Sequence, residues 1–107
     1  MKIQTLNLEP TTGYKTQTTF MQDFSIADHF GIEAVKDTFN RAFKEWKDNY
    51  VYLTELAIVT NLRCWYWYDN GDNELSKVYA DLYYTARNYA LDTLSGEEFQ
   101  YYYKWTD

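Results

Sequence analysis

Residues 51–68, VYLTELAIVTNLRCWYWY, constrain the fold most, because apolar side chains occur all round this stretch when it is wound as a helix. At about 100° per residue, Leu53, Leu56 and Trp67 share one face and Trp65 lies on another. A helix that is apolar on every side is usually buried between neighbours. The alternation in WYWY would also suit a strand, but it continues a helical stretch that stops at DNGDN. The pattern therefore predicts a buried central helix.

The segments on either side carry narrower apolar stripes at helical spacing, over residues 32–49 and 73–94. In the DNGDN turn, Gly71 suits a helix C-cap, and Asp72 or Asn73 suits the next N-cap. Shorter helices are expected before and after these three, over residues 25–30 and from Ser95 onward. The first stripe is Ile32, Val35, Phe39, Ala42, Phe43, Trp46 and Tyr50, and the second is Leu75, Val78, Tyr79, Leu82, Ala86, Tyr89, Ala90 and Leu94.

Residues 1–22 differ in character, because they hold the only proline and six threonines. Proline and threonine both disfavour a helix, so we expect an extended N-terminal arm with a turn near Pro10. Ile3, Leu6 and Leu8 could pack against the helices. We predict an all-α fold, in which this arm precedes a small three-helix bundle with short flanking helices over residues 23–107.

Length and charge narrow the class of protein. A chain of 107 residues is typical of one domain, and its formal net charge of −6 opposes contact with phosphate backbones and anionic membranes. The start MKIQTLNLEP lacks the apolar stretch of a signal peptide, and no run reaches the roughly 18 apolar residues of a membrane span. We therefore expect a cytoplasmic protein.

The stretch DFSIADHFGIEAVKDTFNRAF, residues 23–43, suggests a DNA-binding helix-turn-helix with Gly31 at the turn. The register argues against it, because Asp37 stands where such units bury an apolar residue of the second helix. The second helix also has four acidic and four basic residues over positions 32–48, whereas DNA contact needs a basic footprint. We interpret the stretch as a helical corner and expect no direct binding of duplex DNA.

Residues that could carry chemistry are few. His29 and Cys64 are the only histidine and the only cysteine, and nothing in their neighbourhoods indicates a nucleophile or a zinc site. A calcium loop in DNGDNE is disfavoured because Gly71 occupies the third place, where an oxygen ligand is needed. We predict no enzyme activity, no catalytic residues, no metal site and no cofactor.

Acidic and aromatic residues dominate the last third of the chain, where residues 69–107 hold eight acids and three bases. Three of the acids align on one face of the predicted helix over residues 73–94. Consecutive tyrosines at 101–103 span about 200° of a helix, so they cannot all enter one core. Some aromatics must then be exposed or meet a partner. The candidate interaction surface is Trp65, Trp67, Glu74, Asp81, Tyr84, Asp92 and Tyr102.

The run DFSIADHFG…AVKDTFNRAFKEWKDNYVYLTELAIVTN through LSGEEFQYYYKWTD resembles small proteins encoded by conjugative and transposon-like elements of gut and other Gram-positive bacteria. The resemblance covers most of the chain after residue 20 and includes no catalytic motif, so it assigns no functional residues. It implies a bacterial mobile element. Small acidic proteins of such elements include inhibitors of restriction and CRISPR systems.

Two functions follow as hypotheses. The first is a non-enzymatic protein-binding or accessory module, whose partner is a second copy or a host protein. The second is a DNA mimic that inhibits a host defence protein of the restriction or CRISPR type. Glu74, Asp81 and Asp92 extend over about 27 Å, whereas duplex DNA has one charge per roughly 1.7 Å of axis. The first hypothesis therefore ranks above the second, and a helix-turn-helix regulator ranks last.

Overall fold

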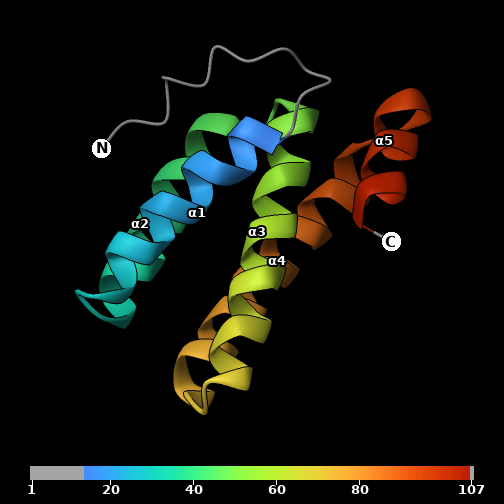
Figure 1. Ribbon diagram of the computed structural model, residues 1–107. Helices are drawn as coiled ribbons and strands as arrows, with labels where there is room; N and C mark the ends of the chain where they lie inside the picture. Colours follow the sequence, from blue (N-terminus) through green and yellow to red (C-terminus); the bar gives the residue numbers. More distant parts are fainter. Residues whose placement is uncertain (1–13, 107) are drawn as a thin grey trace.

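The structure of the protein is a computed structural model that describes residues 14–106, and helices make up nearly all of that range (Figure 1). The described part contains no strand, which confirms the predicted all-α class. None of its helices combines the length and the apolarity that crossing a membrane requires. The helices are α1 (Tyr14–Asp28), α2 (Ile32–Trp46), α3 (Tyr50–Asp69), α4 (Asn73–Thr93) and α5 (Gly96–Thr106).

The helices pack around α3 (Figure 1). Helix α4 returns antiparallel to α3 after a short turn, and the hydroxyl of Ser76 donates to the carbonyl of Cys64 at 2.9 Å. Helices α1 and α2 lie side by side and pack against α3, while α5 contacts the first half of α3. Every other helix therefore contacts the one that the sequence predicts to be central.

The first half of α3 is buried on all sides. All side chains over residues 51–57 are buried, including two that carry polar groups. The hydroxyls of Thr54 and Thr60 donate to the carbonyls of Tyr50 and Leu56 at 2.7 and 2.9 Å, so their hydrogen-bonding groups are satisfied inside the helix. The apolar pattern correctly predicts burial of the first half of this helix, but the second half departs from it, because Leu62, Trp65, Tyr66 and Tyr68 are exposed.

The predicted extended arm is wrong over residues 14–22, which form the first part of α1. The short helix expected over residues 25–30 is the end of that same helix. Phe20 and Phe24 are fully buried. Burying each phenyl ring contributes about 1.5–3 kcal/mol, whereas threonine loses at most about 0.7 kcal/mol of helix propensity. Tertiary packing therefore outweighs the local preference.

The predicted arm residues Ile3, Leu6 and Leu8 lie outside the described residues. Within the described range, the flanking helices are not minor additions to a three-helix bundle. Helix α1 contributes Phe20 and Phe24 to the core. The described domain is therefore better regarded as five helices with one shared core.

Side-chain caps begin both α3 and α4, and those in the DNGDN turn agree with the prediction. Asn49 caps α3 by accepting from the backbone N–H groups of Val51 and Tyr52 at 3.1 Å. The Asp72 carboxylate caps α4 by accepting from the Leu75 N–H at 2.9 Å. Gly71 has a φ of 82°, which is the left-handed conformation typical of the residue that follows a helix C-cap.

The helical corner at Gly31 also matches the predicted register of α2. Val35 and Phe39 are buried, whereas Asp37 is exposed. Gly31 has a φ of 106°, a conformation that favours glycine, and it allows α1 to end and α2 to begin within three residues.

Candidate interaction surfaces and the buried polar cluster

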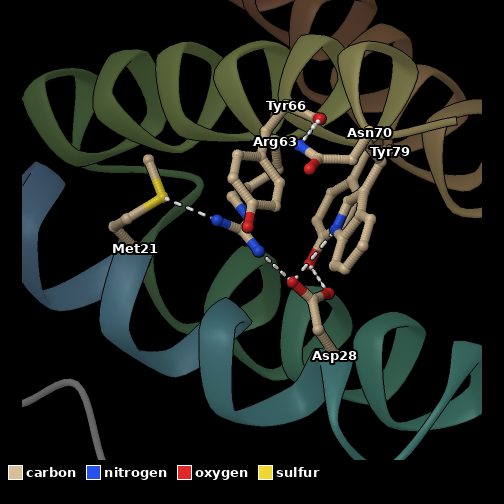
Figure 2. Close-up of polar contacts among 7 residues, drawn as sticks. Met21, Asp28, Arg63, Tyr66, Asn70 and Tyr79 are labelled. Atoms are coloured by element: carbon tan, nitrogen blue, oxygen red, sulfur yellow. Dashed lines mark hydrogen bonds and ion pairs between the residues drawn. The ribbon is translucent and has the colours of Figure 1, made fainter. Parts of the chain in front are cut away.

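The carboxylate of Asp28, the last residue of α1, binds side chains from α3 and α4 (Figure 2). The Tyr79 hydroxyl donates to Oδ1 at 2.5 Å, the Trp67 indole N–H donates to Oδ2 at 3.1 Å, and Arg63 forms an ion pair with Oδ2. The side chains of Asp28 and Arg63 are only 5% and 11% exposed. We call Asp28, Arg63, Trp67 and Tyr79 the Asp28 cluster.

Arg63 is held on several sides. One of its terminal nitrogens contacts Met21 Sδ at 3.8 Å, and its guanidinium lies 4.4 Å from the ring centroid of Tyr66 (Figure 2). Burial and the hydrogen bond to Asp28 raise the pKa of the Tyr79 phenol. The Asp28 cluster therefore joins α1 to α3 and α4 through charged hydrogen bonds in a buried setting, and we assign it a structural role.

Large apolar side chains are exposed on the second half of α3. Leu62, Trp65, Tyr66 and Tyr68 are 47%, 56%, 47% and 59% exposed, and we call these four residues the α3 aromatic surface. The rings of Trp65 and Tyr68 meet edge to face at 5.6 Å between centroids. The Arg63 guanidinium supports the ring of Tyr66 from the protein side. Contiguous exposed apolar residues of this kind are typical of interaction sites.

Several of the predicted surface residues are exposed, and others are not. Trp67 is half-buried and its indole N–H donates to Asp28. Tyr102 is 4% exposed and lies in the core, where burial raises the pKa of its phenol to about 12. Tyr102 is therefore corrected from the candidate surface to the core, and Trp67 is corrected to a half-buried position whose indole N–H is directed into the domain. Those that the structure places at the surface are Trp65, Glu74, Asp81, Tyr84 and Asp92.

Neighbouring residues explain the correction at α5. Tyr103 and Trp105 are 57% and 51% exposed although they lie on nearly opposite sides of α5, and the buried Tyr102 lies between them around the helix. Tyr101 donates to Glu55 Oε2 at 3.4 Å and is only partly buried. The prediction that some aromatic residues of this segment are exposed is therefore confirmed. Which of them are buried depends on how α5 packs against α3, and this could not be predicted from helical spacing.

A cavity that sequence analysis missed lies between α1 and α2. It has a volume of about 620 Å³, and Asp23 on its wall is only 8% exposed. The wall residues are Asp23, Ile26, Ala27, Phe30, Ala34, Asp37, Thr38, Arg41, Lys44 and Glu45. The wall residues that α1 contributes are spaced three or four positions apart, as on one face of a helix. This face can be found in the sequence once residues 14–28 are known to form one helix.

The residues considered for catalysis or metal binding do not come together in the structure. His29 is exposed at the end of α1, and Cys64 Sγ lies 3.5 Å from the hydroxyl of Ser76. Within residues 14–106, no group of three or more histidine, cysteine, aspartate or glutamate side chains is placed to hold a metal ion.

Comparisons of the chain with protein-family models, with curated proteins and with solved structures found no match.

Proposed function

We propose that this chain is a non-enzymatic protein-binding module and that it recognises its partner through the α3 aromatic surface. The observation that carries the proposal is the exposure of Leu62, Trp65, Tyr66 and Tyr68 on one side of a helix whose opposite side is buried. Tryptophan and tyrosine are enriched at the centres of protein interfaces, because each offers a large apolar area and a polar group.

The support of Tyr66 by Arg63 strengthens this proposal. An aromatic ring that is already held in place loses less conformational entropy when a partner binds. Arg63 is itself held by Asp28, so the buried polar cluster indirectly orients part of the α3 aromatic surface. The role as an accessory protein of a bacterial mobile element is a further part of the proposal and depends only on the sequence resemblance.

Self-association is the first test, since it requires no knowledge of a foreign partner. Sedimentation equilibrium at tens of micromolar should report a dimer that Trp65→Glu converts to a monomer. Leu91→Glu is the matched control, because Leu91 is 42% exposed on α4 and lies outside the α3 aromatic surface.

If the protein is a monomer, quantitative capture from bacterial host cells should show a protein that is retained by the Leu91→Glu variant and lost by the Trp65→Glu variant. The proposal fails if neither dimer formation nor any captured protein depends on Trp65.

Imitation of DNA is a second candidate, favoured by the exposure of Glu74, Asp81 and Asp92 along α4. Lys77 is exposed on the same helix and reduces the negative charge there. A DNA mimic should bind a basic partner with an affinity that falls steeply with salt, and the three acids changed together to glutamine should abolish that binding. Binding through the α3 aromatic surface should instead persist at 0.5 M salt.

A further inference from the structure

The geometry points to the groove between α1 and α2 as a binding site for a small organic cation, with Asp23 as the counter-ion of its ammonium group. This site is separate from the α3 aromatic surface and does not depend on the function proposed above. The ligand class that fits is a primary amine carried on an apolar or aromatic body of low molecular weight.

The dimensions of the groove suit a small molecule. Its volume of about 620 Å³ lies within the roughly 300–1,000 Å³ that is usual for ligand pockets. One wall is formed by residues 23–27 of α1 together with Phe30 just beyond the end of that helix, and the other by residues 34–45 of α2. The stripe on α2 extends over about 17 Å at 1.5 Å per residue. The groove is thus large enough to enclose an aromatic ring and a short chain.

Asp23 is the residue that gives the groove a chemical preference. Its side chain is 92% buried, because its exposed fraction is 8%, and its Oδ1 has no hydrogen-bond partner. Burial raises the pKa of this carboxyl, and positive charges, including that of Arg41, act in the opposite direction. No ion pair among the described residues includes Asp23. A buried carboxylate oxygen without a hydrogen-bond partner is destabilising, so a ligand that donates to it gains free energy that water does not supply.

The remaining charges of the groove do not change this preference. Arg41 and Lys44 balance Asp37 and Glu45, since two bases stand against two acids, and all four are exposed. The wall residues then have one acid in excess, and Asp23 is the buried one, so the groove favours a cation. An exposed charge also contributes less than a buried one, because water screens it.

The apolar end of the groove explains why a simple inorganic cation is a poorer fit. Phe30 and Ile26 are 79% and 54% exposed beside the groove, which leaves apolar area that an organic body would cover. Burying such area contributes about 25 cal/mol per Å². An amine with an aromatic or aliphatic body satisfies both the carboxylate and this apolar area at once.

The test is a titration of the ¹⁵N-labelled protein followed by NMR, with phenethylamine as the probe. Phenethylamine is a cation at pH 7, whereas 2-phenylethanol has the same apolar body without the charge and phenylacetate has the opposite charge. We expect amide shifts confined to α1 and α2, with affinity for the amine at least tenfold above that for the alcohol and no binding of phenylacetate. Intermolecular NOEs should connect the ring of the probe to Phe30.

Two substitutions distinguish the contribution of the buried Asp23 carboxylate from that of an exposed acid of the same groove. Asp23→Asn should reduce the affinity for phenethylamine at least tenfold, while Asp37→Asn, which removes an exposed acid of the same groove, should change it less than twofold. Equal affinity for amine and alcohol in the unmodified protein would refute the inference even if Asp23→Asn failed to fold. Shifts that map to α3 or α5, or an Asp23→Asn variant that binds the amine normally, would also refute it.

Discussion

The Asp28 cluster makes a quantitative prediction about stability. Replacing Asp28 by alanine removes the acceptor of two hydrogen bonds and the counter-ion of Arg63 in one change. The guanidinium of Arg63 then stays buried, with only ring contacts and a methionine sulfur near it. We expect the free energy of unfolding to fall by about 3–5 kcal/mol, the usual effect of removing one partner of a buried ion pair.

This loss is a large fraction of the free energy of unfolding of the domain. A domain of this size has a free energy of unfolding of about 5–15 kcal/mol, and each kcal/mol shifts its melting temperature by roughly 4–8 °C. The Asp28→Ala variant should therefore melt at least about 12 °C lower. Adding Arg63→Met should recover part of the loss, since it removes the unpaired charge that the first substitution leaves behind.

Urea denaturation monitored by circular dichroism provides the measurement, with Asp81→Ala as the control. Asp81 is an exposed acid on α4, so its replacement should change the free energy of unfolding by no more than about 0.5 kcal/mol. The structural role of the Asp28 cluster would be refuted if Asp28→Ala lost less than about 1 kcal/mol, or if the added Arg63→Met only deepened the loss.

Three further predictions concern single residues. Tyr102→Ala should destabilise the domain by about 3–5 kcal/mol in the same urea assay, and Tyr103→Ala by less than about 0.5 kcal/mol, because only Tyr102 is buried. Burial and the neighbouring Glu55 raise the pKa of Tyr101 to about 12, so unfolding releases a proton above pH 10 and stability should fall between pH 10 and 12. Urea titrations at pH 9 and 11 should show this fall, reduced in Tyr101→Phe. Burial raises the pKa of Asp23, so the charged form of this side chain destabilises the fold. Asp23→Asn should therefore raise the melting temperature at pH 7. The gain should vanish below pH 4, where Asp23 is protonated in both the folded and the unfolded chain.

Much of the fold could be predicted because three segments have strong helical patterns. The apolar pattern over residues 51–68 predicts a helix that extends from Tyr50 to Asp69, and Asp72, one of two N-cap candidates, caps the next helix. Such signals are local, since a cap and an apolar stripe depend on residues within a few positions of one another.

The failures came where distant contacts decide the outcome. Threonines indicate an extended chain over residues 14–22, yet Phe20 is fully buried in a core to which all five helices contribute and which only the folded chain creates. The same limit applies to Trp65 and Trp67. Helical spacing places them on different faces, but the position of Asp28 determines that Trp67 is the one turned inward.

The two aspartates of α1 illustrate this limit and connect stability to the proposed ligand site. Asp23 and Asp28 are five residues apart, so their side chains point about 140° away from each other around the helix. Asp28 faces α3 and α4 and meets three donors, whereas Asp23 faces α2, where no described side chain donates to its Oδ1. Nothing in the local sequence distinguishes these environments. One carboxylate has its partners within the chain and stabilises the fold, and the other has the unmet hydrogen-bonding capacity that an ammonium ligand would satisfy.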